Sequence, residues 1–203
     1  MKQFFYNKKT VIFGVLLALL IGNLMGTIAN AGEIKNEFVR FHIVANSNDE
    51  RDQAVKWKVR EEIFSRLDFS VITSKEEALY YFYQHQSEIE EIANEVLGEN
   101  NMPYGCSVTV EKKTFPVREY TGFVLPAGTY DAISVTLGHG KGENFFCVMY
   151  PSLCALEGIT EETSAQQEII HHVFSDKKAA FITGNKKQLV YKFKILEIIE
   201  YIF

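Results

Sequence analysis

The chain has 203 residues, three cysteines and a formal net charge of −5 at pH 7. The negative charge argues against a nucleic-acid-binding protein, which would favour a basic face, and weakly against a protein that merely coats anionic lipid. Three cysteines are too few for a fold built on disulfides. Beyond its N-terminal segment, the chain has the length of one globular domain with an ordinary hydrophobic core.

Residues 1–31 are typical of an export signal. Three lysines within the first nine residues precede an apolar run over 11–25, and Ala29-Asn30-Ala31 has the small residues of a signal-peptidase site. A helix over 11–31 would extend about 30 Å, so an uncleaved membrane anchor is the alternative. Polar and glycine residues at positions 22, 23 and 26 make this segment a poor permanent span. We therefore expect a cleaved signal peptide at 1–31 and a single globular domain at 32–203.

The next stretch, residues 38–67, predicts a strand that turns directly into a helix. Apolar and polar residues alternate over 38–45, which is the period of a half-buried strand, and Arg40, His42 and Asn46 fall on one strand face. Ser47 and Glu50 have the spacing of a capping box, and the pattern after them predicts an amphipathic helix over 48–67.

Arg40, His42 and Asn46 have two interpretations. They are either structural, as a polar sheet face or an internal hydrogen-bond network that ties the strand to the helix, or they form a recognition patch, and their spacing alone favours the structural interpretation. Our hypothesis combines the two: Asn46 and Ser47 hold the turn, while Arg40 and His42 are available to a partner.

The rest of the chain predicts one more helix, three strands and a helical C-terminal part. A second capping box, from Ser74 to Glu77, predicts a helix over 75–97, whose glutamates are typical of a solvated side. Alternating residues predict strands over 106–113, 131–137 and 144–150, with a turn at 125–128 and a hairpin loop at 138–142. Helical periodicity returns over 164–174, whereas the stretch from residue 189 fits either a strand or a helix. The order of elements predicts an α+β fold, with helices 48–67 and 75–97 covering one face of a mainly antiparallel sheet.

Several features resemble enzyme or metal sites, but none is convincing. The glycines at 138, 140 and 142 join two strands, so they lack the helix N-terminus of a phosphate-binding loop. Cys147 with His139 or His42 could be a nucleophile and its base, yet a strand cysteine is more typical of a buried hydrophobe. His171 and His172 are adjacent on a predicted helix and point in different directions, which makes a poor metal pair. The sequence predicts no catalytic residue, no cofactor and no metal, and an interaction protein rather than an enzyme.

Two of the cysteines are candidates for a disulfide. Cys147 and Cys154 flank the turn at Pro151, and we predict that they pair after export, which leaves Cys106 reduced.

Three ordered motifs suggest a family. The first is Arg40-Phe-His42-Ile-Val-Ala45-Asn46-Ser47, followed by Asp52-Gln53 and Lys56-x-Lys58-Val59-Arg60. The second is Leu125-Pro126-Ala-Gly128-x-Tyr130-x-Ala132. The third is Gly138-x-Gly140-x-Gly142-x-Asn144-x-x-Cys147-Val148-x-x-Pro151-x-Leu153-Cys154. Together with the N-terminal segment, these motifs resemble the stage II sporulation protein R family. The chain departs from the family pattern at Phe145-Phe146, where paired tryptophans are usual, and at Ser152, where a second proline is usual.

The resemblance implies a signalling protein of endospore-forming bacteria. Such a protein is secreted from the forespore into the space between the two septal membranes, or stays tethered there through residues 11–31. It would activate a membrane-embedded aspartic peptidase of the mother cell, which processes the sigma-E precursor; neither a nucleic acid nor a small-molecule substrate is implied. The motifs supply the candidate partner-binding residues: Arg40, His42, Asn46, Asp52, Gln53, Lys56, Arg60, Tyr130, Gly140, Asn144, Phe145 and Phe146. The competing hypotheses are an exported cell-envelope enzyme acting on wall or carbohydrate, and a purely structural envelope domain.

The export signal gives a first prediction. Because Ala29-Asn30-Ala31 follows a charged and then an apolar segment, the mature protein should begin at Gly32. N-terminal sequencing of protein from the exported fraction measures this directly. An exported chain that still begins at Met1 or Lys2 would instead be a membrane anchor.

Overall fold

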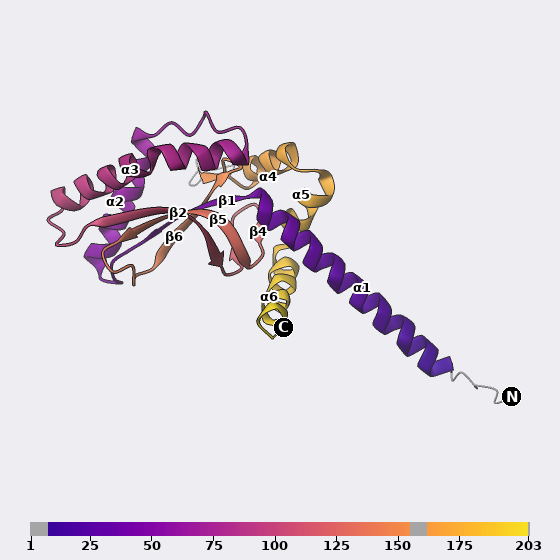
Figure 1. Ribbon diagram of the computed structural model, residues 1–203. Coiled ribbons are helices and arrows are strands. Elements are labelled where there is room, and N and C mark those ends of the chain that lie inside the picture. The colour runs from indigo at the N-terminus through magenta and orange to yellow at the C-terminus, as the bar shows by residue number, and fades with distance from the viewer. Residues whose placement is uncertain (1–7, 155–161, 203) are drawn as a thin grey trace.

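The computed structural model describes residues 8–154 and 162–202, which form an α+β domain with a long N-terminal helix extending from it (Figure 1). That helix, α1, runs from Lys8 to Glu37. A four-stranded sheet lies at the centre of the domain, and a two-stranded sheet, β3 (Arg118–Glu119) with β4 (Val124–Leu125), lies apart from it. The predicted fold class is confirmed.

The central sheet is mixed, with strand order β2-β5-β1-β6. Strand β1 (Val39–Val44) pairs in parallel with β5 (Gly128–Leu137) and antiparallel with β6 (Asn144–Tyr150). Strand β2 (Cys106–Phe115) pairs antiparallel with β5 along its whole length. Most pairings are therefore antiparallel, as predicted, and the β1–β5 pair is the exception.

The predicted hairpin at 138–142 is wrong. Strands β5 and β6 are consecutive in the sequence, but β1 lies between them, so the loop must cross the end of β1 to reach β6. The sequence contains the glycines of a tight loop, and these suit a crossing loop as well as a hairpin. Only long-range pairing separates the two possibilities.

The prediction that β1 is half-buried is also wrong, because the strand is covered on both faces. All six of its residues are buried. On one face, Phe41 and Ile43 pack beneath α2 (Glu50–Arg66) and α3 (Lys75–Glu99). The other face of the sheet packs at one end against α1, the β3–β4 sheet, α4 (Glu162–Val173) and α5 (Asp176–Thr183). The undecided last stretch is a helix, α6, from Lys186 to Ile202.

The two predicted capping boxes have different outcomes. The capping box at Ser47 is wrong: α2 begins at Glu50 after an N-cap Asp49, and Ser47 Oγ accepts a hydrogen bond from Asp49 N at 3.1 Å. The second box is correct at its first residue, because Ser74 Oγ accepts from Glu77 N at 3.1 Å. In a capping box the Glu77 carboxylate would accept from the backbone N–H of Ser74. Here it accepts from the preceding residue, Thr73 N, at 2.9 Å.

Helix α1 continues through the predicted cleavage site. Its segment Thr10–Glu37 is long and apolar enough to cross a membrane, and only its C-terminal part packs on the domain. Ala31 and Ile34, on either side of Gly32, are buried in the domain core. In the folded chain the bond after Ala31 is therefore helical and covered, so a peptidase would have to act before this segment folds or after it unwinds.

The structure brings the sulfur atoms of Cys147 and Cys154 together. Their Cα atoms lie 5.5 Å apart, within the usual range for a disulfide. Cys106 lies apart from them as a half-buried thiol, and burial, together with the charge of Glu90, raises its pKa to about 12.

We therefore predict one disulfide in the exported protein. Mass spectrometry without reductant should find a peptide that carries Cys147 and Cys154 and lacks two hydrogens, whereas Cys106 should be alkylated once the protein is unfolded. In the chain-entropy model the cross-link stabilises the fold by about 2–3 kcal/mol, so a Cys147→Ser, Cys154→Ser double variant should be less stable by that order. Alkylation at both positions in the native exported protein would contradict the prediction.

Candidate functional site

The first and third motifs meet where β1 ends and α2 begins. The loop that crosses this end of β1 donates hydrogen bonds to it: Gly142 N to Ala45 O at 2.8 Å, and Lys141 N to Asn46 O at 3.1 Å. The approach is so close that a Cβ on Gly142 would clash with the backbone carbonyl of Ser47. The loop can therefore cross the end of β1 in this way only if residue 142 is glycine.

Asn46 is the central residue of the junction. Its Oδ1 accepts from His139 N at 2.9 Å, and its Nδ2 donates to Asp52 Oδ2 at 2.8 Å. Asp52 is buried, and its Oδ1 accepts from Tyr104 OH at 2.5 Å. Burial by itself raises the pKa of Asp52, but hydrogen bonds from Tyr104, Ser47 and Asn46 outweigh it and hold the pKa below its usual value. Asn46 therefore joins the strand end, the crossing loop and the first turn of α2.

Gln53 and Lys56 extend this network along α2. Gln53 Nε2 donates to Ser47 O at 2.8 Å, and Lys56 Nζ donates to Gln53 Oε1 at 2.7 Å and to Glu143 O at 3.1 Å. The Lys56 side chain is buried, and burial lowers its pKa. Asn46, Asp52, Gln53 and Lys56 therefore form an internal hydrogen-bond network between the end of β1, the crossing loop and α2.

Arg40 lies in an aromatic cage beneath the opposite face of the sheet. Its side chain is 0% exposed, and its guanidinium carbon lies 4.1 Å from the ring centre of Phe115 and 5.0 Å from that of Tyr130. Nη2 donates to Tyr120 OH at 2.8 Å, while the buried Nε and Nη1 have no hydrogen-bond partner. Within residues 8–154 and 162–202, no acidic side chain forms an ion pair with Arg40. The hypothesis that Arg40 faces a partner is wrong, because the folded protein hides it.

His42 is buried next to Arg40, so its expected exposure is wrong too. Its Nε2 lies 2.7 Å from Ser134 Oγ, which donates to Glu111 Oε1 at 2.9 Å. The serine hydroxyl therefore accepts from Nε2–H, and this assigns the neutral tautomer with a bare Nδ1. Burial, followed by the charges of Lys113 and Arg40, lowers the pKa of His42 from its usual 6.5 to about 3.

Phe145 and Phe146 lie on opposite faces of β6. Phe145 is buried under α2, with its ring centre 5.3 Å from both the Trp57 ring and the Arg60 guanidinium carbon. Phe146 is half-buried on the other face, where the Arg118 guanidinium carbon lies 3.8 Å from its ring centre. The two residues therefore belong to separate environments and do not form one patch.

The remaining candidates are also dispersed. Tyr130 is buried, and its hydroxyl donates to Pro126 O at 2.5 Å. Gly140 has φ of +61°, which favours glycine, and a Cβ there would press on Thr136. Asn144 is exposed at the start of β6. The structure thus gathers the candidate residues into a junction network and a buried cage and leaves few of them at the surface.

Sequence reasoning missed several residues of these two environments. Phe115 and Tyr120 contact the Arg40 guanidinium, and Arg118 lies over Phe146. These three residues follow the predicted strand 106–113 in a stretch that gave no periodic signal. Trp57 of α2, which no motif singled out, is 47% exposed.

Among the described residues, no group of three or more histidine, cysteine, aspartate or glutamate side chains has a geometry that could hold a metal ion.

The cage gives a prediction for Arg40. Arg40→Ala should destabilise the fold by about 3 kcal/mol, because it leaves a cavity among the rings. Arg40→Met should lose much less, about 1 kcal/mol or below, because it keeps the aliphatic stem and removes buried N–H groups that lack partners. Urea unfolding of both variants measures this difference. Equal losses in the two variants would mean that the guanidinium charge itself stabilises the fold.

The lowered pKa of His42 predicts an acid-sensitive fold. Between pH 6.5 and about 3 the unfolded chain binds a proton at this site and the folded chain does not, so unfolding becomes more favourable as the pH falls. His42 should contribute up to about 1.4 kcal/mol per pH unit to this slope. His42→Gln should make the slope of unfolding free energy between pH 4 and 6 shallower, and His139→Gln in the exposed loop is the matched control. An unchanged slope in His42→Gln would show that the histidine is protonated in the folded state.

Comparison with known proteins places these motifs in a family. A family model described as stage II sporulation protein R matches residues 35–160. The chain is also 35% identical, over 173 residues, to the stage II sporulation protein R of Bacillus subtilis (strain 168), which covers 79% of this chain and 77% of that protein. No solved structure matches. The matched residues include the β1–α2 junction, the crossing loop and the cage, and the chain belongs to the stage II sporulation protein R family.

Proposed function

We propose that this sporulation protein is an exported signal that activates a membrane-embedded aspartic peptidase, which then processes the sigma-E precursor. The observation that carries the proposal is the family match over residues 35–160, which spans all three motifs. The apolar helix α1 supports delivery to a membrane, whether it is a signal peptide or an anchor. The protein itself needs no catalytic residue in this role, because the peptidase performs the chemistry.

The burial of the motif residues restricts where such a peptidase could bind. Arg40, His42, Asp52, Lys56 and Tyr130 are buried, so they act by holding the fold. A contact surface must consist of side chains that the folded protein presents. The exposed side of α2 presents one such side chain, Trp57.

Trp57 is the anchor that we assign to this contact. It is 47% exposed, and its ring is held in place by the edge of Phe145 at 5.3 Å and by Lys56 Nζ at 5.2 Å. A rigid, half-exposed tryptophan is the kind of side chain that contributes most to protein interfaces. The junction network fixes the helix that carries it, so the motif residues position the contact without touching the peptidase.

Trp57→Ala tests this assignment. The variant should unfold within about 1 kcal/mol of the wild type, because half of the ring is already in water. It should lose most of the precursor cleavage when it is co-expressed with the peptidase and the precursor in a non-sporulating host. Tyr80→Ala is the matched control, since Tyr80 is a 69% exposed aromatic residue on α3. Full cleavage with Trp57→Ala would exclude Trp57 as the anchor, and an absence of cleavage with the wild type would overturn the proposed function.

A further inference from the structure

Helix α6 exposes an apolar stripe that no part of the described chain covers. Tyr191, Ile195 and Ile198 are 71%, 55% and 59% exposed. Their spacing of four and three residues places them on one side of the helix. Three large apolar side chains in a row are unusual for a surface that faces only water.

The opposite side of α6 is also apolar and is already in use. Leu189, Phe193 and Leu196 are buried in a cluster with Ala31 of α1 and Val124 of β4. This contact fixes the rotation of α6 about its axis. The helix therefore cannot turn its exposed stripe into the domain.

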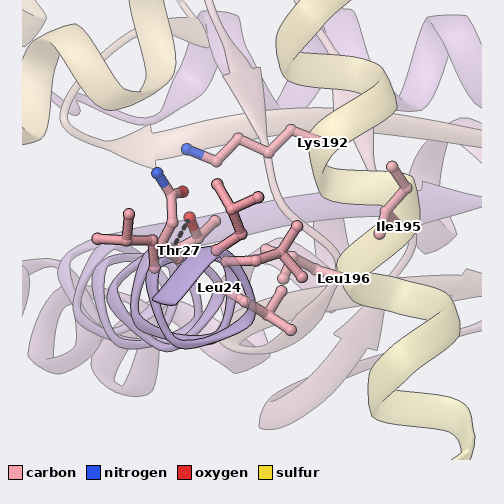
Figure 2. A pocket seen from close by; sticks show the side chains of 9 residues that line it. Leu24, Thr27, Lys192, Ile195 and Leu196 are labelled. Atoms are coloured by element: carbon pink, nitrogen blue, oxygen red, sulfur yellow. Dashed lines mark hydrogen bonds between the residues drawn. The ribbon is translucent and has the colours of Figure 1, made fainter. Parts of the chain in front are cut away.

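Helices α1 and α6 enclose an apolar groove of about 590 Å³ (Figure 2). Leu24 of α1 and Leu196 of α6 lie close together in it, and Lys192 extends from α6 toward α1. The other lining residues of α1 are three leucines, Leu16, Leu19 and Leu20, together with Asn23 and Thr27. Across the groove from these leucines lies Ile195, a member of the exposed stripe.

The position of the groove along α1 indicates what fills it. The segment of α1 that lines the groove is part of the one described helix able to cross a membrane. Leu16 to Leu24 belong to the apolar segment that would lie in a bilayer, and Ile195 and Leu196 of α6 line the same groove as these leucines. Lipid around α1 would therefore reach the groove and, through Ile195, the exposed stripe of α6.

The charges of α6 favour the same occupant. Lysines at positions 186, 187, 192 and 194 outnumber the glutamates at 197 and 200, although the whole chain is acidic. An apolar stripe with adjacent lysines is the pattern of a helix that lies at the boundary between headgroups and acyl chains. A second copy of the chain is a poorer occupant, because a stripe of three side chains is small beside a stable dimer interface.

We propose that α6 is a second membrane-contacting helix. Tyr191, Ile195 and Ile198 lie at the headgroup–acyl boundary of the bilayer that α1 enters, and acyl chains fill the groove between the two helices. This arrangement applies to the chain that retains α1. It holds the domain at a fixed tilt on the membrane and does not depend on the peptidase.

Tryptophan fluorescence of the full chain in vesicles tests the proposal. The chain has a single tryptophan, Trp57, which is replaced by phenylalanine so that a new tryptophan on α6 is the only one. One variant combines Trp57→Phe with Ile195→Trp, and a second combines Trp57→Phe with Ile198→Trp. Each is reconstituted in phosphatidylcholine–phosphatidylglycerol vesicles whose acyl chains carry bromine atoms near the headgroup. The wild type, with Trp57, and a Trp57→Phe, Tyr80→Trp variant on exposed α3 are the controls.

The tryptophans on α6 should emit at shorter wavelength and be quenched at least twofold more strongly by the brominated lipid than either control. Quenching equal to that of the controls at both α6 positions would overturn the proposal. Short-wavelength emission without bromine quenching, and dependent on protein concentration, would assign the stripe to a second copy and overturn it as well.

Discussion

Strand β1 is the element on which the rest of the structure depends. It is hydrogen-bonded on one side to β5 and on the other to β6, and side chains cover both of its faces. An arginine and a histidine on such a strand have no access to water. The protein accommodates them with rings and hydroxyl groups, because a buried charge or polar atom is costly unless its surroundings interact with it.

The central place of β1 also explains why the first and third motifs are linked. Because β5 and β6 flank β1, the chain that joins them has to pass over the end of β1, where the backbone needs hydrogen-bond partners. Asn46 supplies one partner from its side chain, and the glycines allow the loop to approach closely enough for backbone bonds. Asp52, Gln53 and Lys56 then fix the start of α2 against the same loop. The first and third motifs, which lie almost a hundred positions apart in the sequence, therefore form one structural unit.

In the proposed function, this unit positions the contact surface and does not itself touch the partner. The motif residues are mainly buried, and what they orient is the exposed side of α2 with Trp57. At the other end of the domain, α1 and α6 provide an apolar surface of a different kind. An activator held on a membrane by this second surface would present α2 in a restricted set of orientations. That restriction raises the effective concentration of a contact with a membrane-embedded partner.

The sequence by itself determined the elements whose periodicity is long and regular: the apolar N-terminal helix, the helices near 48–67 and 75–97, and the strands that begin near residues 38, 106, 131 and 144. Helical and strand periods are local properties, so they can be recognised from the order of residues. It also indicated that Asn46 holds the turn between strand and helix, because a polar residue at such a junction can satisfy nearby backbone and side-chain groups. By sequence, Asp52 and Lys56 are only candidate partner contacts, and their place in the network comes from the structure.

Only the tertiary structure decided the order of the strands and, with it, the burial of Arg40 and His42. Alternation predicts which residues share a face of β1, but whether that face meets water depends on Phe115, Tyr120 and the helices far along the chain. The same reason applies to Trp57, to the crossing loop and to the stripe on α6. Exposure follows from packing between distant segments, and no local pattern in the sequence encodes it.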